Sequence, residues 1–199
     1  MNWYKHAQLK ETLPYFKEFE EYGESGNYIP DEESLSKHLQ DLNTSIVSDI
    51  GQGDSGVAYQ LSNGDILKIT TNDQEGKVAQ YLINNPIPCI VQYKHIWKEG
   101  DLYFIIMEKL DQMITDVPDL ADAFRKLDKI LDENHCYNPQ CAYKIITNPQ
   151  YTNLFLPDLY QMIIDYLLYL KEIPMKIFDF LDPNNIGLKN GKIKFFDIT

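Results

Sequence analysis

Three glycines and one lysine form the pattern with the most chemical content in this sequence. Gly51, Gly53 and Gly56 have the spacing G-x-G-x-x-G, and Lys68 follows inside the apolar run Ile66–Ile69. Residues without a Cβ let backbone N–H groups approach phosphate oxygens, and a lysine ammonium neutralises phosphate charge. The glycine spacing alone also fits dinucleotide-binding folds and ordinary turns. The pattern therefore predicts phosphate binding only where the neighbouring elements support it.

The elements expected around the glycines separate these alternatives. A dinucleotide site needs its glycines to open a helix, whereas residues 57–61 here predict a strand. Asn63 and Gly64 then indicate a tight hairpin, and residues 66–70 predict a further strand that carries Lys68. The expected order is strand, glycine turn, strand, tight turn and lysine-bearing strand.

This order resembles the start of the protein-kinase-like superfamily, in a minimal or atypical form. The resemblance begins near Ile46, is good through Leu110, and is good again from Leu181 to Asp197. It implies an α+β, two-lobe fold with a five-stranded antiparallel sheet, a reduced helical second lobe and a helical N-terminal leader. The implied domains are a leader over 1–45, a first lobe over 46–110 and a second lobe over 111–199.

Local patterns predict the remaining strands of this arrangement. A short helix is expected after Thr70, and prolines at 86 and 88 end it. Strands are expected over 90–97 and 102–107, which completes five strands and one helix. A hairpin is expected near the end of the sequence, with its turn at 189–191.

The leader and the middle of the chain are expected to be mostly helical. Two helices are predicted within 1–45, the second over 32–42 with Asp31 as its N-cap, and the leader is expected to dock on its own domain. Pro118 and Pro157 stand at favourable first-turn positions of two further helices. The polar segment 134–153 is expected to be a variable loop.

The resemblance implies an ATP site in the first lobe. The glycine turn and Lys68 would position the phosphates. Met107 would lie beside the adenine, and the backbones of Glu108 and Leu110 would hydrogen-bond its edge. A flexible hairpin is the alternative for the glycines, and a surface lysine on an edge strand is the alternative for Lys68.

Glu75 has two competing interpretations. It is the best candidate for a helix-borne acidic partner of Lys68, which precedes it by seven residues. Asn72 stands three positions before Glu75, so the two residues also fit a capping box at the start of a helix. The sequence leaves both interpretations open.

The metal site implied by the resemblance lies near the end of the sequence. Asp197 would hold Mg²⁺ across the β- and γ-phosphates, together with Asn184 or Asn185. The sequence ends two residues after Asp197, without the activation segment and later helices of the family. The expectation is a minimal form of the fold, or a partner that supplies the missing parts.

Two alignments, or registers, of the loop before the metal site with the family motif assign the catalytic position to different residues. Residues 181–186 match L-x-P-x-N-I, which puts Phe180 at the catalytic Asp position. A phenyl ring accepts no proton, so this register implies a pseudokinase. The other register takes Asp179 as the catalytic residue and allows phosphotransfer. It puts Asn184 at the expected spacing, or Asn185 after a one-residue insertion. Asp182 is a candidate substitute for the base.

Composition excludes several classes of protein. The chain has 199 residues, 44% hydrophobic content and a formal net charge of −12, which is typical of a globular protein and disfavours nucleic-acid binding. Three cysteines without a C-x-x-C pair fit a reducing cytoplasm. No run is apolar enough for a signal peptide or a membrane helix.

The sequence thus predicts an ATP- and Mg²⁺-dependent phosphotransferase acting on a protein Ser/Thr or small-molecule hydroxyl. Lys68 and Asp179 would carry the chemistry, which is mostly positioning and charge neutralisation. The alternative is an inactive pseudokinase that senses nucleotide or binds a protein. The expected partners are a nucleotide and a protein, and no membrane. Mimicry of nucleic acid by the acidic surface is a weaker alternative.

Overall fold

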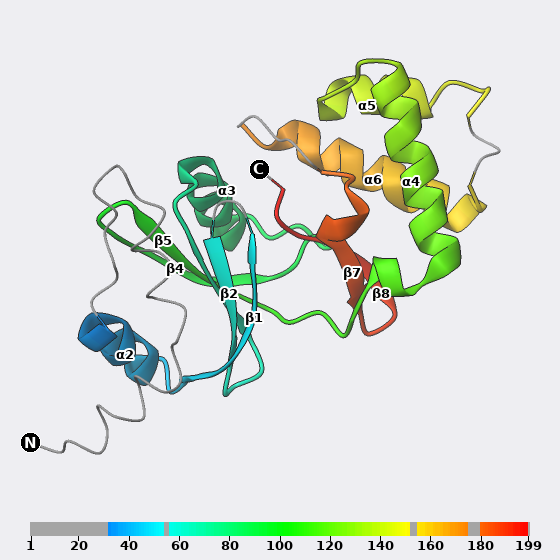
Figure 1. The fold of residues 1–199 in the computed structure, drawn as a ribbon. Coiled ribbons are helices and arrows are strands. Elements are labelled where there is room, and N and C mark those ends of the chain that lie inside the picture. The colour runs from blue at the N-terminus through cyan, green and yellow to red at the C-terminus, as the bar shows by residue number, and fades with distance from the viewer. Residues whose placement is uncertain (1–31, 54–55, 152–154, 175–179, 199) are drawn as a thin grey trace, which may run out of the picture. The chain divides into compact units, whose positions relative to one another are not determined.

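The computed structural model describes residues 32–53, 56–151, 155–174 and 180–198 (Figure 1). These residues form an α+β protein that divides into two compact units. Of the described residues, the first unit holds 32–80 and 93–108, and the second holds 81–92 and 109–198. The first of the two predicted leader helices falls in 1–31, outside the described residues.

The first unit is built on a five-stranded antiparallel sheet, as the sequence predicts. The strands pair in the order β1-β2-β3-β5-β4. Gly64, at a φ of +88°, lies in the predicted tight turn between the second and third strands. The strands are β1 (Ile46–Gly53), β2 (Gly56–Leu61), β3 (Ile66–Thr70), β4 (Tyr93–Glu99) and β5 (Leu102–Met107).

Strand β4 begins at Tyr93 and not at Ile90, where the sequence predicts its start. The preceding residues pair instead within the second unit. The Val91 N–H donates to the carbonyl of Phe195, and the Phe195 N–H donates to the carbonyl of Cys89, both at 2.9 Å. Apolar residues on both sides of the strand start look alike in sequence, and tertiary pairing decides where the strand begins.

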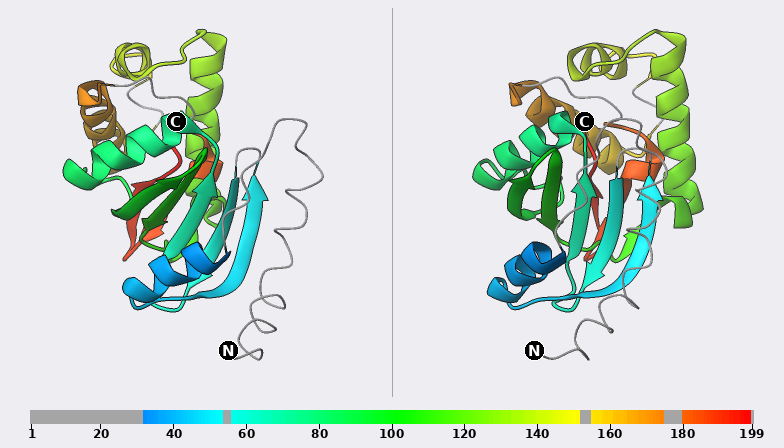
Figure 2. Two further views of the ribbon diagram at one scale, coloured as in Figure 1. Left: turned by 90° about the vertical axis from the view of Figure 1, so that its left-hand side faces the viewer. Right: turned by 60° about the vertical axis from the view of Figure 1, so that its left-hand side comes forward.

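Helix α2 (Glu32–Asp41) docks on one face of the sheet, as expected for the leader (Figure 2). Leu35 and Leu39 are one helical turn apart, so both project from one side of the helix. They are 2% and 4% exposed and belong to the buried cluster of this unit. Its other members come from the strands and are Val57, Tyr59, Leu61, Leu67, Ile69, Leu102, Phe104 and Ile106.

Helix α3 (Asp73–Asn84) follows the third strand, as predicted. In β5 the even-numbered residues from Leu102 to Ile106 belong to the cluster beneath α2. Side chains alternate along a strand, so the odd-numbered residues Tyr103 and Ile105 face away from that cluster. The ring of Tyr103 lies against Gly76 of α3. The start of α3 therefore covers the opposite face of the sheet from α2.

The second unit contains a small antiparallel sheet in the order β6-β7-β8. Strands β7 (Ile186–Lys189) and β8 (Lys192–Phe195) form the predicted hairpin. Asn190 and Gly191 form its turn, at φ values of +51° and +70°. Strand β6 (Gln112–Met113) was not predicted, because a strand of two residues carries no periodic pattern.

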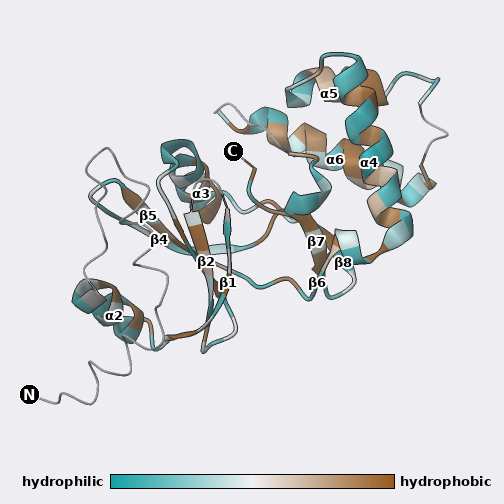
Figure 3. Ribbon diagram, in the orientation of Figure 1, coloured by the Kyte–Doolittle hydropathy of each residue, from teal (hydrophilic) through white to brown (hydrophobic). Residues whose placement is uncertain are grey.

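Among the described residues, the α-helices α4 (Pro118–Glu133), α5 (Pro139–Ile146) and α6 (Pro157–Glu172) complete the second unit, and one of them differs from the sequence-based expectation. Helices α4 and α6 begin at the prolines that predict them. Figure 3 shows both hydrophilic and hydrophobic stretches on α4 and α6. Helix α5 lies in the segment predicted to be a loop. Asn138 caps this helix by accepting a hydrogen bond from the Cys141 N–H. The cap satisfies a backbone N–H group at the start of the helix, which favours a helix despite the polar composition of the segment.

The cysteines also differ from expectation. Cys136 and Cys141 form a disulfide next to α5, with their Cα atoms 5.6 Å apart. This bond does not fit the reducing cytoplasm inferred from the sparse cysteines. Burial raises the pKa of the free Cys89 thiol to about 11, so this cysteine stays protonated and unreactive. None of the described helices has the length and apolar character to cross a membrane.

Candidate functional site

A buried ion pair between Lys68 and Glu75 is the centre of the candidate site in the first unit. Lys68 Nζ lies 2.6 Å from Glu75 Oε1, and the two side chains are 15% and 5% exposed. In β3 the neighbours Leu67 and Ile69 belong to the cluster beneath α2. Alternation along the strand therefore turns Lys68 to the face that α3 covers. The lysine is not on the protein surface, which removes the surface alternative.

Both interpretations of Glu75 hold in part, because its backbone and its side chain act separately. Asn72 Oδ1 accepts hydrogen bonds from the Gln74 N–H at 2.9 Å and the Glu75 N–H at 3.2 Å. Asn72 is therefore the N-cap of α3, as half of the predicted capping box requires. The carboxylate of Glu75 pairs with Lys68. Residue 75 thus joins the start of the helix to the third strand.

The three glycines occupy the β1–β2 hairpin, and their surroundings differ. A Cβ added to Gly56 would overlap the backbone carbonyl of Ile69 on the neighbouring strand. Gly56 is thus needed for strand packing, whatever else it does. Gly53 pairs with Gly56, and residues 54–55 between them lie outside the described residues. Gly51 follows a bulge in β1, with open space around it.

The residues expected beside an adenine follow β5. Met107 ends that strand and is 8% exposed. Glu108 is half-buried, and it is the last residue of the stretch 93–108, which belongs to the first unit. Leu110 belongs to the second unit, where its side chain fills the space that a Cβ on Gly187 would need. The three residues predicted to contact adenine are therefore divided between the two units.

In the second unit, Phe180 precedes the short 3₁₀ helix η4 (Pro183–Asn185), and one register of the sequence assigns this phenylalanine to the catalytic position. Phe180 is 5% exposed, and its carbonyl accepts a hydrogen bond from the Tyr166 hydroxyl at 2.8 Å. The Tyr166 ring stacks on Phe195 with centroids 3.5 Å apart. Phe180 is thus part of the core of this unit. Asp179, the base in the other register, lies outside the described residues.

Asp182 and Asn184 are bound to each other. Asp182 Oδ1 accepts hydrogen bonds from the backbone N–H of Asn184 at 2.9 Å and from its side-chain Nδ2 at 3.0 Å. Asp182 therefore caps the short 3₁₀ helix η4 (Pro183–Asn185). Its predicted role as a substitute base competes with this structural use.

Asn185 and Asp197 lie next to each other. The Asn185 Nδ2 donates to the Asp197 carbonyl at 3.4 Å, and the Phe196 N–H donates to the Asn185 carbonyl at 2.9 Å. Asp197 has a φ of +52°, a left-handed conformation that Asp tolerates better than most residues. Of the two predicted asparagine ligands, Asn185 is the one beside Asp197. Amide and carboxylate oxygens are donors that Mg²⁺ accepts, so this pair fits the implied metal by chemistry.

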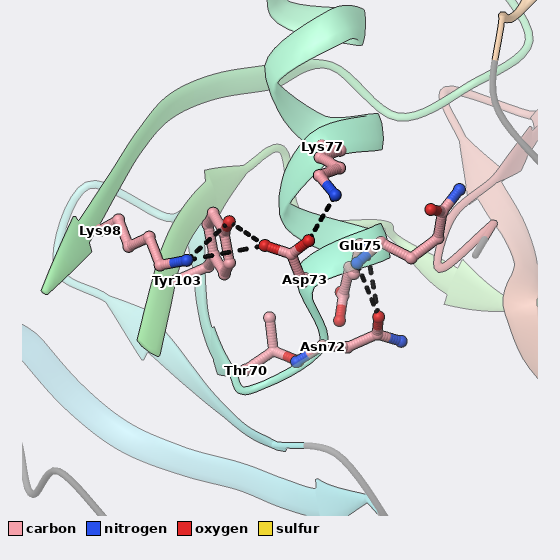
Figure 4. Close-up of polar contacts among 8 residues, drawn as sticks. Thr70, Asn72, Asp73, Glu75, Lys77, Lys98 and Tyr103 are labelled. Atoms are coloured by element: carbon pink, nitrogen blue, oxygen red, sulfur yellow. Dashed lines mark hydrogen bonds and ion pairs between the residues drawn. The ribbon is translucent and has the colours of Figure 1, made fainter. Parts of the chain in front are cut away.

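Sequence reasoning missed a polar cluster at the start of α3. Its members are Asp73 and Lys77 of α3, Lys98 of β4 and Tyr103 of β5 (Figure 4). The spacing of Asp73 and Lys77, four residues on one helix, is a signal that the sequence contains. Their contacts with the two strands depend on tertiary structure.

The described residues contain no group of three or more His, Cys, Asp or Glu side chains that could hold a metal ion. Neither a scan against protein-family models nor a search of curated proteins finds a match to this sequence. The geometry of the two units is therefore the basis for any functional conclusion.

Proposed function

We propose that this chain is an ATP- and Mg²⁺-dependent phosphotransferase of the protein-kinase-like type, with a protein or small-molecule hydroxyl as acceptor. The Lys68–Glu75 ion pair carries the proposal. A largely buried lysine held by a helix-borne glutamate presents a fixed positive charge, which is what positioning of α- and β-phosphates requires. The antiparallel sheet with its glycine hairpin next to the lysine-bearing strand is the second support.

The remaining roles come from the two units separately. Gly51, Gly53 and their N–H groups would approach the phosphates, and Met107 and Glu108 would contact the adenine with Leu110. Asn185 and Asp197 would hold Mg²⁺, which supplies neutralisation of phosphate charge. Asp179 would orient the acceptor hydroxyl. A cytoplasmic location is part of the proposal, and the Cys136–Cys141 disulfide is the observation against it.

A specific observation favours a second candidate, a pseudokinase that binds nucleotide or a protein partner without phosphotransfer. Asn185 rather than Asn184 lies beside Asp197. Asn185 fits the register that puts Phe180 at the catalytic position without any insertion, and there the Phe180 side chain is buried and accepts no proton, whereas the Asp179 register needs a one-residue insertion to use Asn185. In that register the Lys68–Glu75 pair serves nucleotide binding alone.

Two measurements test the proposal in sequence. The first is the thermal midpoint of the full chain with ATP, with and without Mg²⁺, for wild type and Lys68→Met. ATP at 100 times its Kd adds about 2.7 kcal/mol, which raises Tm by roughly 5–11 °C for a chain of this size. A shift that needs Lys68 supports nucleotide binding, and no shift at millimolar ATP overturns it.

The second measurement is transfer of labelled phosphate from ATP to an acceptor pool, the chain itself included. Variants Asp179→Asn and Asp182→Asn separate the two candidate bases, and Asp197→Asn tests the metal ligand. ATP binding without transfer in wild type selects the pseudokinase.

Lys94→Met is the matched control for Lys68→Met in the thermal measurement. Lys94 pairs with Asp65 at 2.6 Å on the same sheet, away from the glycine hairpin. It should leave the ATP-induced shift unchanged.

A further inference from the structure

The hydroxyl of Tyr103 in β5 takes part in two hydrogen bonds, one with a charged group of α3 and one with a charged group of β4. The hydroxyl donates to Asp73 Oδ1 at 2.5 Å and accepts from Lys98 Nζ at 3.0 Å (Figure 4). A tyrosine hydroxyl can donate one hydrogen bond, and Tyr103 donates it to a carboxylate at the start of α3. Hydrogen bonds to charged groups are stronger than neutral ones. The hydroxyl thus ties β5 to the first turn of α3.

Two lysine ammonium groups also contact the same carboxylate. Lys77, one turn along α3, places its Nζ 2.5 Å from Asp73 Oδ2. Lys98 Nζ lies 3.6 Å from Asp73 Oδ1 and 4.3 Å from the centroid of the Tyr103 ring. Asp73 is therefore held from its own helix, from β4 and from β5. We call Asp73, Lys77, Lys98 and Tyr103 the α3 latch.

Gly76 gives an independent sign that the position of Tyr103 matters. A Cβ on Gly76 would overlap the Tyr103 ring, so the ring lies directly on the helix backbone. Glycine forms a helix less readily than alanine because it loses more backbone entropy on folding. The close contact with the ring requires a residue without Cβ at this position. Both the ring and the hydroxyl of Tyr103 thus define where α3 begins.

The residues that contact Tyr103 flank Glu75 on both sides in the sequence. Asp73 and Gly76 contact the tyrosine, and Glu75 between them reaches Lys68 on β3. All of these residues belong to the first unit. A helix turn moves as a rigid element, so displacement of Asp73 and Gly76 displaces Glu75 with them. The latch and the buried ion pair are two attachments of one helical turn.

We propose that Tyr103 is a positioning residue: through Asp73 and Gly76 it fixes the first turn of α3 so that Glu75 holds Lys68. Its link to phosphotransfer or nucleotide binding rests on the proposed function, whereas its effect on the Lys68–Glu75 pair does not. The latch is on the surface, where ion pairs contribute little to global stability. Its loss should therefore change the position of α3 more than the stability of the protein.

The first test follows the ion pair directly in the full chain. Lysine ¹⁵Nζ NMR signals are recorded for wild type, Tyr103→Phe and Tyr81→Phe, with the Lys68 signal assigned from its loss in Lys68→Arg. Amide exchange in the first two turns of α3 is measured on the same samples. Tyr81 is the matched control: it lies on the same helix, and among the described residues its hydroxyl makes no hydrogen bond.

The proposal expects Tyr103→Phe to move the Lys68 signal and to speed α3 exchange by about tenfold, the loss of one hydrogen bond to a charged group. Tyr81→Phe should do neither. An unchanged Lys68 signal and unchanged α3 exchange in Tyr103→Phe overturn the proposal. These readouts need no nucleotide, so they test whether Tyr103 positions the Lys68–Glu75 pair even if the chain binds no ATP.

The second test asks whether Tyr103 acts through Lys68. ATP affinity is measured for Tyr103→Phe in the wild-type background and in Glu75→Gln, which keeps Lys68 and removes the charge of its partner. A loss of several-fold in the first background and none in the second supports positioning through the ion pair. An equal loss in both backgrounds overturns it, because Tyr103 would then act by another route. Absence of ATP binding in wild type counts against the proposed function, and the NMR and exchange data then decide whether the latch holds the ion pair.

Discussion

At the scale of single residues, the Lys68–Glu75 pair is the most consequential contact in the first unit. Its two charges are largely removed from water, and each has a desolvation penalty that the partner must offset. A pair that only stabilised the fold would be replaceable by apolar side chains of similar size. A pair that positions phosphate would not. Stability and binding measurements on the same variants therefore separate the two roles.

We expect Glu75→Ala to lower the free energy of unfolding by about 3 kcal/mol, because it removes the carboxylate that offsets the desolvation of the Lys68 ammonium. The double variant Lys68→Met with Glu75→Leu should recover most of this loss and should still fail to bind ATP. Denaturant unfolding and an ATP titration measure both quantities. Asp122→Ala is the control, since its pair with Arg125 is exposed on α4 and its loss should change stability by less than about 1 kcal/mol. A double variant that binds ATP as wild type does would contradict the positioning role.

At the scale of elements, α3 is the part of the first unit on which the site depends. Asn72 caps its first turn, Glu75 points to the sheet, and Asp73 is held by the latch. The hydrogen bond from Lys77, and after it that from Tyr103, lowers the pKa of Asp73 from 3.8 to about 2. The latch thus stabilises the folded protein wherever Asp73 is ionised. One helical turn therefore combines a cap, a latch and a site residue.

The pH dependence of the latch follows from the direction of this shift. Because the pKa of Asp73 is lower in the folded protein, its contribution is fully present above about pH 4 and is lost as pH falls towards 2. At pH 3 the Asp73 ¹³Cγ NMR signal should be mainly that of the carboxylate. Lys77→Met should shift it towards the protonated form, and Tyr103→Phe should do so less. Added salt should act in the same direction, since the group is exposed. A mainly protonated Asp73 at pH 3 in wild type would count against the latch.

At the scale of the whole molecule, the first unit is a sheet with helices on both faces. Helix α2 contributes Leu35 and Leu39 to the cluster beneath the sheet, where Trp97 stacks on Phe104 with centroids 4.9 Å apart. His38 of α2 stacks on Trp97 in turn, at 5.1 Å. Helix α2 is therefore part of the core of the first unit. Any truncation that removes α2 should expose this cluster.

We expect Leu35→Ala and Leu39→Ala each to lower the free energy of unfolding by about 2–5 kcal/mol, as for other buried leucines. Leu156→Ala should stay within about 0.5 kcal/mol, because Leu156 is 75% exposed. Urea unfolding of the full chain measures all three. If the α2 variants unfold like wild type, then α2 does not belong to the core of the first unit.

Much of the fold could be predicted because its signals are local. The strands of the first unit, the hairpin after Asn185 and the helices that begin at Pro118 and Pro157 follow from side-chain periodicity and turn residues. Helix α5 also had a local signal, the Asn138 cap before a proline, which the polar composition of the segment obscured. The missed strand β6 has no such signal, because it consists of two residues paired with a distant hairpin.

The candidate site divides in the same way. The sequence by itself determined that Lys68 lies on a strand and that Asn72 precedes a helix, since spacing along one element sets both. Only the tertiary structure decided that Glu75 reaches Lys68, that Asn185 lies beside Asp197 and that Tyr103 holds Asp73. These contacts join residues of different elements, and their formation depends on how the elements pack. Local propensity does not encode the packing of a ring on Gly76 or of a carbonyl against Gly56, because both are contacts with distant parts of the chain.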